Sequence, residues 1–231
     1  MRTIGMIGGM SWESTLVYYR IINEAVRARL GGLHSAKSIL YSVDFAQIDA
    51  LQHAGRWDAA QSILVQAAQA LVRAGADLVI ICTNTMHKLA DGVAAGMTVP
   101  LLHIADPTAD AVLAAGMDTV ALLGTRFTME EAFYRRRLED RYGLRVLIPD
   151  AFQRQAVHDT IYTELCLGRI REPSRQAYLR IIEGLVERGA QGVILGCTEI
   201  GLLVDAESCP VPVFDTARIH AEAAVTAALT D

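Results

Sequence analysis

Two short polar loops carry the side chains of this chain that are best suited to chemistry, and each directly follows an apolar run. Residues 197–199, which read Cys-Thr-Glu, follow the run 192–196, and residues 83–85, which read Thr-Asn-Thr, follow the run 78–82. A thiol beside a carboxylate and a hydroxyl suits nucleophilic attack or proton transfer. The chain shows no spacing typical of a metal site around these loops. Cys197 is therefore the first candidate catalytic residue.

The two loops occupy equivalent places in an internal repeat. Aligning residues 71–76 with 185–190 gives an offset of 114, which places Thr83 on Cys197 without a gap. Two further pairs of segments match in the same order at offsets of 116 and 112, namely 2–9 with 118–125 and 99–103 with 211–215. A repeated half should repeat its first strand as well as its site strand. We therefore predict two copies of one half that face a shared site.

A duplicated site places equivalent groups on opposite faces of one bound molecule. One reaction that needs an acid and a base on opposite faces is the inversion of a stereocentre, in which one group removes an α-proton and the other returns a proton from behind. Position 83 and Cys197 are the two equivalent groups. The repeat therefore favours inversion at carbon among the reactions open to a thiol.

Composition argues against several functional classes. The chain has 231 residues, 52% of them hydrophobic and 20% charged, which is enough for a full core without disulfide bonds. Its apolar runs are far shorter than the roughly 20 residues of a membrane span. The formal charge of −5 gives no reason to expect nucleic acid, and the arginine run 135–137 lies among acidic residues. With four cysteines in no CxxC spacing and no basic-then-apolar leader, we expect a reduced cytoplasmic enzyme.

Strand and helix patterns alternate along the chain, which predicts an α/β fold with parallel sheets covered by helices on both faces. The expected strands are 3–7, 39–43, 78–82, a segment opening at 99, 119–123, 145–148, the run before Cys197 and 211–214. Ligands of such sheets bind at the carboxyl ends of the strands, where both polar loops lie. Gly8 and Gly9, at the end of the first strand, are expected to let the backbone approach a small ligand.

Helix starts are predicted from capping residues. The expected N-caps are Ser11, Asp58 and Ser174, and a capping box is expected from Thr128 and Glu131. The residues after Pro149 show less periodicity. The expected division is a first half of residues 1–100 plus 211–231 and a second half of residues 101–210.

Several motifs together resemble the cofactor-independent aspartate/glutamate racemase family. They are the opening segment 4–14, which reads Ile-Gly-Met-Ile-Gly-Gly-Met-Ser-Trp-Glu-Ser, the segment 42–45, Asn84-Thr85, and Gly-Cys-Thr-Glu at 196–199. The resemblance spans nearly the whole chain and is closest to the bacterial branch of broad or aspartate/glutamate-directed amino-acid racemases. It implies two flavodoxin-like halves with the site between them, a homodimer, no pyridoxal phosphate or other cofactor, no metal, and two cysteines as the opposed acid and base.

One position departs from the family pattern. The family's first cysteine immediately precedes Asn-Thr, and here that position is Thr83, with Cys82 one residue earlier. Successive side chains of a strand point to opposite faces, so Cys82 should point away if Thr83 points into the site. A hydroxyl delivers a proton, or positions a water, far more readily than it removes a proton from carbon. We therefore expect Thr83 and Cys197 to be the catalytic pair, with the two directions of reaction catalysed unequally.

The resemblance also carries over substrate contacts. Met10, Gln52 and Thr125 stand at matching positions. The family's further lining residue, a lysine, has no clear counterpart, because the segment 165–169 offers only Arg169 as a basic residue.

Backbone N–H groups of Asn84-Thr85 and Thr198-Glu199 are expected to hold the α-carboxylate of a small amino acid, helped by the positive end of a helix beginning near Met86. Glu199 either accepts the substrate ammonium or caps the following helix. Since no inward arginine is evident for an acidic side chain, a neutral polar substrate such as homoserine stays open beside aspartate and glutamate.

Five other residues of reactive type have less specific interpretations. His87 and Lys88 either serve the site or lie on a surface helix face, and Cys82, Cys166 and Cys209 are expected to be structural.

Two alternative functions remain open on the sequence alone. The same fold can use a single cysteine for maleate cis-trans isomerisation or for decarboxylation, and Thr83 would also permit an amino-acid sensor without catalytic activity.

Overall fold

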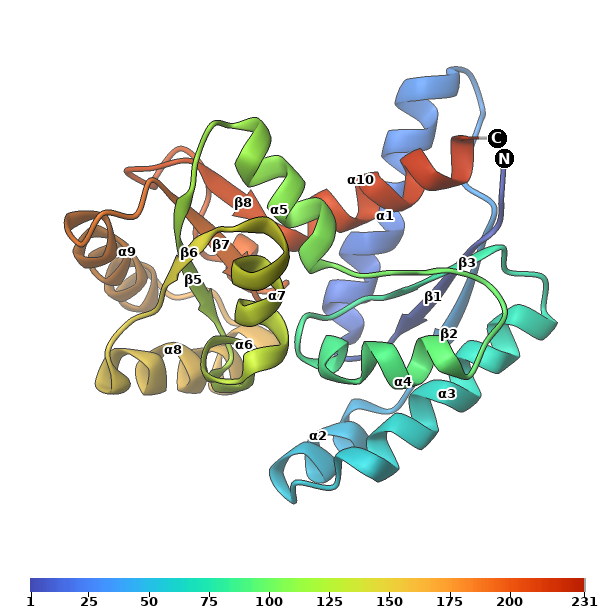
Figure 1. The fold of residues 1–231 in the computed structure, drawn as a ribbon, viewed down its shortest axis with the longest axis horizontal. Helices are drawn as coiled ribbons and strands as arrows, with labels where there is room; N and C mark the ends of the chain where they lie inside the picture. The colour runs from blue at the N-terminus through green and yellow to red at the C-terminus, as the bar shows by residue number, and fades with distance from the viewer. Residues whose placement is uncertain (231) are drawn as a thin grey trace. The chain divides into compact units, whose positions relative to one another are not determined.

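The chain folds into two compact units, and each is described by itself. The computed structural model describes residues 1–230 (Figure 1). Unit 1 comprises residues 1–104 together with the chain from His220 onward, and unit 2 comprises Ala105–Ile219. Each unit contains one four-stranded sheet in which every described pairing is parallel. The predicted α/β fold is confirmed.

Unit 1 is built on a sheet with the strand order β2-β1-β3-β4. Its strands are β1 (Ile4–Gly8), β2 (Ser38–Ser42), β3 (Leu78–Ile81) and β4 (Leu101–Leu102). Right-handed crossovers then place the helix after β1 on one face and the later helices on the other. Figure 1 shows this arrangement: α1 (Trp12–Leu30) and α10 (Thr216–Leu229) lie on one face, and α2 (Phe45–His53), α3 (Trp57–Arg73) and α4 (Ala90–Ala95) lie on the other.

The core of unit 1 lies between α3 and the sheet. Apolar side chains at helical spacing on α3, among them Leu64 and Leu71, pack with Val79 and Ile81 of β3. Both faces of the central strands are covered, so β1 and β3 are buried along their whole length. This explains why both strands are continuous apolar runs and show no alternation.

Of the two helix caps predicted in unit 1, one is confirmed and the other is wrong. Ser11 caps α1 as predicted, and its side-chain oxygen accepts a hydrogen bond from the Ser14 N–H at 3.3 Å. The predicted cap of α3 is wrong, because the helix begins at Trp57 and Arg56 stands at the cap position. Asp58 lies in the first turn and pairs with Arg56 at 3.2 Å. A carboxylate in the first turn still complements the positive end of the helix.

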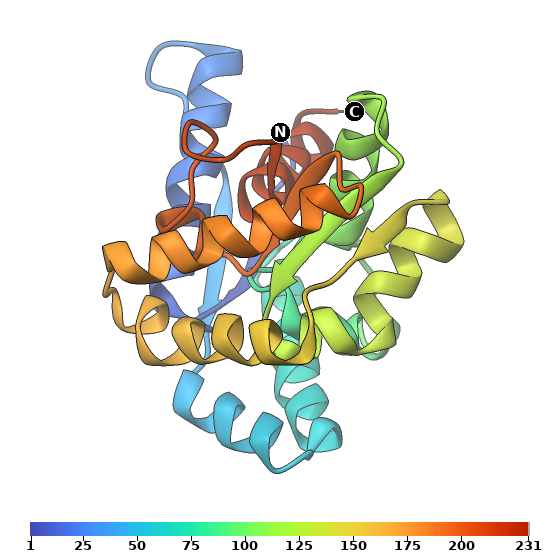
Figure 2. The same cartoon turned by 90° about the vertical axis from the view of Figure 1, so that its left-hand side faces the viewer.

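Unit 2 repeats the strand order of unit 1. Its strands are β5 (Thr119–Gly124), β6 (Arg145–Leu147), β7 (Gly192–Gly196) and β8 (Val213–Asp215), in the order β6-β5-β7-β8. Figures 1 and 2 show α8 (Ala151–Thr163) and α9 (Glu172–Glu187) on one face of this sheet, and α5 (Ala105–Ala114) and α7 (Ala132–Tyr142) on the other. The shared order confirms the repeat that the sequence matches predict.

The strand pairings move both boundaries of the expected division. Residues 211–231 were expected in the first half, but β8 pairs with β7 in the second sheet, and only the chain from His220 onward belongs to unit 1. Residues 101–104 were expected in the second half, but β4 pairs with β3 in the first sheet. Backbone pairing sets these boundaries, and the apolar patterns alone do not specify it.

The capping box predicted from Thr128 and Glu131 does not form. Thr125, which directly follows β5, instead caps the short helix α6 (Arg126–Glu130) by accepting a hydrogen bond from the Thr128 N–H at 3.3 Å. Glu131 has extended backbone angles and separates α6 from α7. A Ser/Thr-x-x-Glu pattern can therefore begin inside a helix whose cap comes three residues earlier, and end beyond that helix.

Two further helix starts in unit 2 differ from the expectation. The segment after Pro149 forms α8, which opens with a capping box between Asp150 and Gln153. Ser174 lies within the first turn of α9 and is not its cap, and its hydroxyl donates to the Glu164 carboxylate at 2.6 Å.

Glycines at the carboxyl ends of the strands allow close packing of the chain on itself. A Cβ on Gly8 would lie 2.5 Å from Thr15, and one on Gly9 would lie 2.2 Å from the Val43 carbonyl oxygen. Gly9 also has a φ of 90°, which L residues rarely adopt. Steric contact within unit 1 therefore accounts for both glycines without the ligand contact expected from the sequence.

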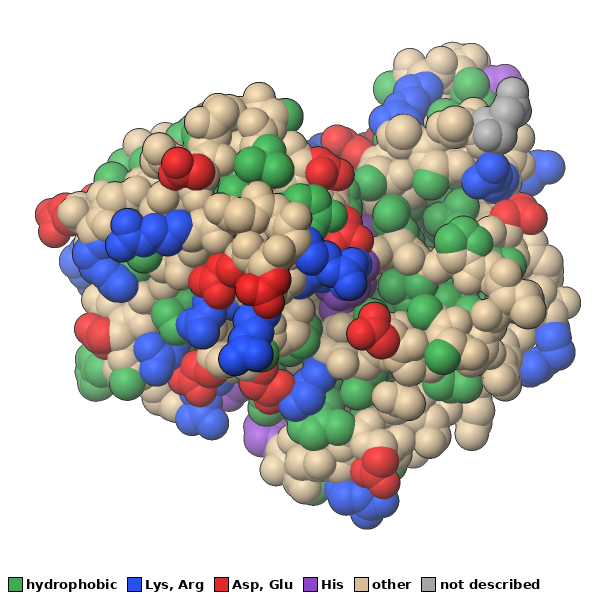
Figure 3. All heavy atoms as spheres, viewed as in Figure 1, with side chains coloured by type: hydrophobic (Ala, Val, Ile, Leu, Met, Phe, Trp, Pro, Cys, Tyr) green, Lys and Arg blue, Asp and Glu red, His purple; other side chains and the backbone are tan. Residues whose placement is uncertain are grey.

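Charged side chains of both signs are interspersed over the helices of unit 2 (Figure 3). Within the arginine run of α7, Arg137 pairs with Asp106 at 2.6 Å and Arg135 with Glu139 at 3.6 Å. Two arginines of the run are thus paired with acidic side chains of unit 2. None of the helices in residues 1–230 combines the length and hydropathy needed to cross a membrane.

Candidate active site

Strand β3 delivers Cys82 and Thr83 to the carboxyl edge of the first sheet. Cys82 is fully buried, whereas Thr83 is partly exposed, which is the alternation that an extended chain requires. Burial raises the pKa of the Cys82 thiol, so this thiol stays protonated at neutral pH. Cys82 is therefore a core residue, and Thr83 is the residue that β3 presents at the edge of the sheet.

The loop after Thr83 turns at once into the 3₁₀-helix η1 (Thr85–Leu89), followed by α4. Asn84 and Thr85 are buried at its start. The expected helix N-terminus near Met86 is thus a single 3₁₀ segment, whose shortness limits its dipole. Any anion bound here would be held by individual backbone N–H groups.

His87 is buried, in contrast to the surface position considered from the sequence. Its Nδ1 lies 2.8 Å from the Thr83 carbonyl oxygen, and its Nε2 lies 3.2 Å from the Ile104 backbone nitrogen. Lys88 is partly exposed, and its ammonium lies 3.8 Å from the centroid of the Trp57 ring, a cation–π contact. Both residues thus have structural partners in unit 1.

Met10 and Gln52 join the loop of β3 in unit 1. Met10 follows β1 and belongs, with Met86, to the buried core cluster. Gln52, at the end of α2, is buried, and its amide nitrogen lies 3.9 Å from the Met86 sulfur. The structure therefore brings Met10, Gln52 and the 83–86 loop together at one edge of the first sheet.

Strand β7 delivers Cys197 to the equivalent edge of the second sheet. Gly196, its last residue, pairs in register with Gly124 of β5, so the residues that follow, Cys197 and Thr125, leave the sheet side by side. A Cβ on Gly124 would lie 2.8 Å from the Gly196 carbonyl oxygen. The two glycines thus permit the close approach of the strands at this point.

Cys197, Thr198 and Glu199 form a buried hydrogen-bonded group. The Cys197 thiol donates to Glu199 Oε2 at 3.0 Å, and the Thr198 hydroxyl donates to the same oxygen at 2.7 Å. Glu199 opens the 3₁₀-helix η3 (Ile200–Leu202) but makes no capping bond with its side chain. Of the two roles considered for Glu199, the structure therefore does not support the cap.

The surroundings of Cys197 favour the neutral thiol. Burial raises its pKa well above the ordinary value, and the negative charge of Glu199 and the hydrogen bond to that carboxylate raise it further, with a contribution from Cys166. The thiol is thus a proton donor at rest. A role as a base would require this proton to pass to another group, and Glu199 Oε2 is an acceptor that the thiol already contacts.

Two hydrogen bonds of these loops were not predicted from the sequence: the one between His87 and Thr83, and the one from Cys197 to Glu199. The His87 bond to Thr83 depends on the burial of η1, which a helical pattern does not reveal. The bond from Cys197 to Glu199 follows from a spacing of two residues, and a carboxylate two residues after a strand-end cysteine was a usable signal.

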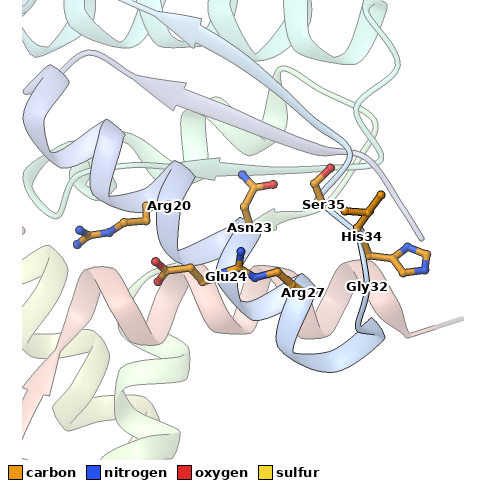
Figure 4. A pocket seen from close by; sticks show the side chains of 8 residues that line it. Arg20, Asn23, Glu24, Arg27, Gly32, His34 and Ser35 are labelled. Carbon is orange, nitrogen blue, oxygen red and sulfur yellow. The ribbon is translucent and has the colours of Figure 1, made fainter.

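A surface cavity of about 420 Å³ in unit 1 is lined by no residue of the 83–85 loop (Figure 4). Its lining comes from α1 and the turn after it, including Arg20, Arg27 and His34. This turn leads into the start of β2, so the cavity lies at the amino ends of the parallel strands. The candidate residues lie at the carboxyl ends, where α/β sheets bind ligands.

Comparison with known proteins gives consistent matches. The model of the Asp/Glu/hydantoin racemase family matches residues 7–224. The broad specificity amino-acid racemase RacX of Bacillus subtilis (strain 168) is 25% identical over 173 residues, which cover 73% of this chain and 72% of RacX.

Two solved structures are similar over the whole length of both chains. A candidate Asp/Glu racemase from Yersinia pestis is 56% identical with a TM-score of 0.93, and each chain is covered in full. PH1733, an aspartate racemase homologue from Pyrococcus horikoshii OT3, is 35% identical with a TM-score of 0.87, again with both chains covered in full.

Replacing Glu199 with Gln should lower the pKa of the Cys197 thiol, because it removes the neighbouring negative charge. Burial, the largest cause, remains, so the pKa should stay above its ordinary value. Thiolate should therefore form at lower pH, and alkylation of Cys197 by iodoacetamide, followed by mass spectrometry of the Cys197 peptide, should be about tenfold faster per pKa unit lost. Thr198→Val is the matched control, since it removes a hydroxyl donor and keeps the charge. Equal alkylation rates in wild type and folded Glu199→Gln would contradict the assigned cause.

Proposed function

The chain belongs to the Asp/Glu/hydantoin racemase family and is an isomerase, and we propose that it inverts the α-carbon of aspartate, glutamate or a similar small polar amino acid. The proposed reaction is a two-sided proton transfer without pyridoxal phosphate or metal. Cys197 acts on one face of the α-carbon and Thr83 on the other. The observation that carries the proposal is the hydrogen bond from the Cys197 thiol to Glu199.

The first step begins at Cys197. Glu199 takes the thiol proton, and the resulting thiolate removes the α-proton of the substrate. The carbanion then receives a proton on its opposite face from the Thr83 hydroxyl or from a water that this hydroxyl holds. Cys197 is a thiol again once it holds the α-proton, and solvent carries the proton on Glu199 to the alkoxide or hydroxide left at position 83, which restores the resting state.

The reverse direction requires a base at position 83. A hydroxyl is a much weaker carbon base than a thiolate at neutral pH, and the pKa of Cys82, the adjacent thiol, is raised by its burial. Thr83 therefore favours proton delivery over proton removal. We infer that the enzyme uses the two enantiomers unequally.

Substrate recognition is assigned to the loops at the ends of β3 and β7. Backbone N–H groups of Asn84-Thr85 and Thr198-Glu199 would hold the α-carboxylate, and the buried Glu199 carboxylate would attract the ammonium. The rest of the proposed substrate site would be lined by Met10, Gln52 and Thr125. Similarity to the Yersinia pestis protein favours aspartate or glutamate, whereas similarity to RacX favours a broader range that would include homoserine.

We also propose a cytoplasmic homodimer. Among the described residues the four cysteines form no disulfide bond, which suits a reducing compartment. The outer part of α1 and the edge strand β2 expose a group of large apolar side chains, with Trp12 at 65% and Leu16 at 59% exposed, together with Tyr19, Leu40 and Tyr41. An exposed apolar patch of this kind fits a twofold contact between two copies of the chain.

Replacing Leu16 with Asp should weaken the dimer, because it places a charge within this apolar patch. We expect sedimentation velocity to show a dimer for the wild type and a monomer for the variant at micromolar concentration. Leu113→Asp, at an exposed leucine of α5, is the matched control and should remain dimeric. A monomeric wild type, or a Leu16→Asp protein that stays dimeric, would exclude this interface.

Cys197→Ser should abolish α-proton exchange, since a serine hydroxyl cannot replace the thiolate as a carbon base. Cys209→Ser is the matched control at a partly exposed cysteine outside the two loops and should exchange at the wild-type rate. Initial rates of α-deuterium incorporation in heavy water measure both variants, with circular dichroism as the test of folding.

Thr83→Cys should raise exchange chiefly for the enantiomer whose α-hydrogen faces position 83, because it supplies the missing thiol. The change in volume is small, so stability should change little. Thr83→Ala should lower turnover without restoring the balance between enantiomers. An unchanged enantiomer ratio in folded, substrate-binding Thr83→Cys would show that position 83 is not the second catalytic face.

A further inference from the structure

Unit 1 contains a cluster of buried histidines that the proposed reaction does not use. His87, His103 and His220 are all buried, and the ring centroids of His103 and His220 lie 4.6 and 5.6 Å from that of His87. Buried imidazoles are retained at a cost unless each ring nitrogen has a suitable partner. The partners of these rings therefore indicate what the cluster does.

The two bonds of His87 fix its protonation. The Thr83 carbonyl can only accept, so Nδ1, at 2.8 Å, must carry the hydrogen. The Ile104 backbone N–H can only donate, so Nε2, at 3.2 Å, must be the acceptor. His87 is thus a neutral imidazole with its hydrogen on Nδ1, and both of its nitrogens are bonded to backbone.

These backbone partners occupy defined places in the fold. Thr83 begins the site loop, and Ile104 is the last residue of unit 1 before the chain passes into unit 2. His220 is the first residue of the chain to return to unit 1, and its Nε2 lies 2.9 Å from the carbonyl oxygen of Leu102. Two histidines therefore hold the chain on either side of residue 103, and His87 links this point to the site loop.

We propose that His87 is a positioning residue, which fixes the peptide between Thr83 and Asn84 relative to the exit of the chain from unit 1. In a trans peptide the Thr83 carbonyl and the Asn84 N–H point in opposite directions, so a bond to one sets the direction of both. Loss of that bond frees the peptide to rotate, which moves the Thr83 side chain and turns the Asn84 N–H. The inference rests on the proposed function, which assigns proton delivery to Thr83 and carboxylate binding to Asn84.

Two substitutions of His87 distinguish the effect of its bond to Thr83 from that of its bond to Ile104. The amide of Asn reaches the position of Nδ1, so His87→Asn can keep the bond to Thr83 and loses the bond to Ile104. The amide of Gln reaches the position of Nε2, so His87→Gln can keep the bond to Ile104 and loses the bond to Thr83. A role that depends on Thr83 therefore predicts rescue by Asn and not by Gln.

The readout is the stereochemistry of deuterium uptake. The enantiomer that the wild type uses faster, with Cys197 as its base, is incubated in heavy water, and the deuterated products are separated on a chiral column. Retained product needs only Cys197, whereas inverted product also needs delivery from position 83. His87→Gln should lower the ratio of inverted to retained product about tenfold or more, because a misplacement of about 1 Å can cost on the order of 10²-fold in rate. His87→Asn should stay within about twofold of the wild type.

Two controls distinguish positioning from a general loss of structure. Tyr18→Phe removes the hydroxyl that lies 2.9 Å from His220 Nδ1 but leaves both His87 bonds, so it should lower the melting temperature without changing the product ratio. His53→Gln, at an exposed histidine, should change neither. A fall of inverted and retained product in equal proportion in both His87 variants, or loss in Asn with rescue by Gln, would overturn the proposal.

One measurement requires no variant and no activity. Nitrogen-15 shifts of the wild-type histidines should show His87 as the neutral tautomer with hydrogen on Nδ1, and an Nε2–H tautomer or an imidazolium would overturn the assignment. The proposed function fails in a different way, when the wild type incorporates no α-deuterium from any amino acid tested. The inference fails when the wild type is active and the His87→Gln product ratio is unchanged.

Discussion

We propose that the chemistry of this protein depends on one buried hydrogen bond, from the Cys197 thiol to the Glu199 carboxylate. A carboxylate out of contact with water is costly unless donors surround it, and the Thr198 hydroxyl and the Cys197 thiol both donate to the same oxygen. Burial first, and the Glu199 charge second, raise the pKa of the Cys197 thiol and keep the proton on sulfur. The proton of this bond therefore lies between a thiol that holds it and a carboxylate that can accept it. We expect a bound substrate that changes the local charge to shift this proton.

The repeated topology supplies the second constraint. Both sheets have the same strand order. In the first sheet β3 pairs with β1, in the second β7 pairs with β5, and both β3 and β7 end in a polar loop. The loops have nevertheless diverged, because the loop after β7 holds a thiol and a carboxylate, whereas the loop after β3 holds a hydroxyl whose carbonyl is bound by His87. We propose that this divergence between two loops of the same topology makes the enzyme use the two enantiomers unequally.

Structural features that depend on residues close together in the sequence were predictable. Features that depend on contacts between residues far apart in the sequence were not. The Ser11 cap, the buried central strands and the alternation of Cys82 with Thr83 depend on local spacing and were read from the residues. The Thr128–Glu131 pattern failed because Thr125, fixed by the end of β5, caps the helix first. The sequence left His87 open between the site and a surface helix face, because its burial depends on the backbone at Ile104 and on α10, which lie far along the chain. The position of β8 likewise required the register with β7.

The central claim is that this chain inverts an α-carbon by proton transfer on two faces. The most direct test incubates the wild type with single enantiomers of aspartate, glutamate and homoserine in heavy water and follows the deuterium and the configuration of the α-carbon together. The proposed mechanism predicts α-deuterium in the inverted product of at least one of these amino acids, with different initial rates from its two enantiomers. Binding without α-deuterium, or isomerisation of maleate by a protein that leaves all three amino acids unchanged, would contradict it.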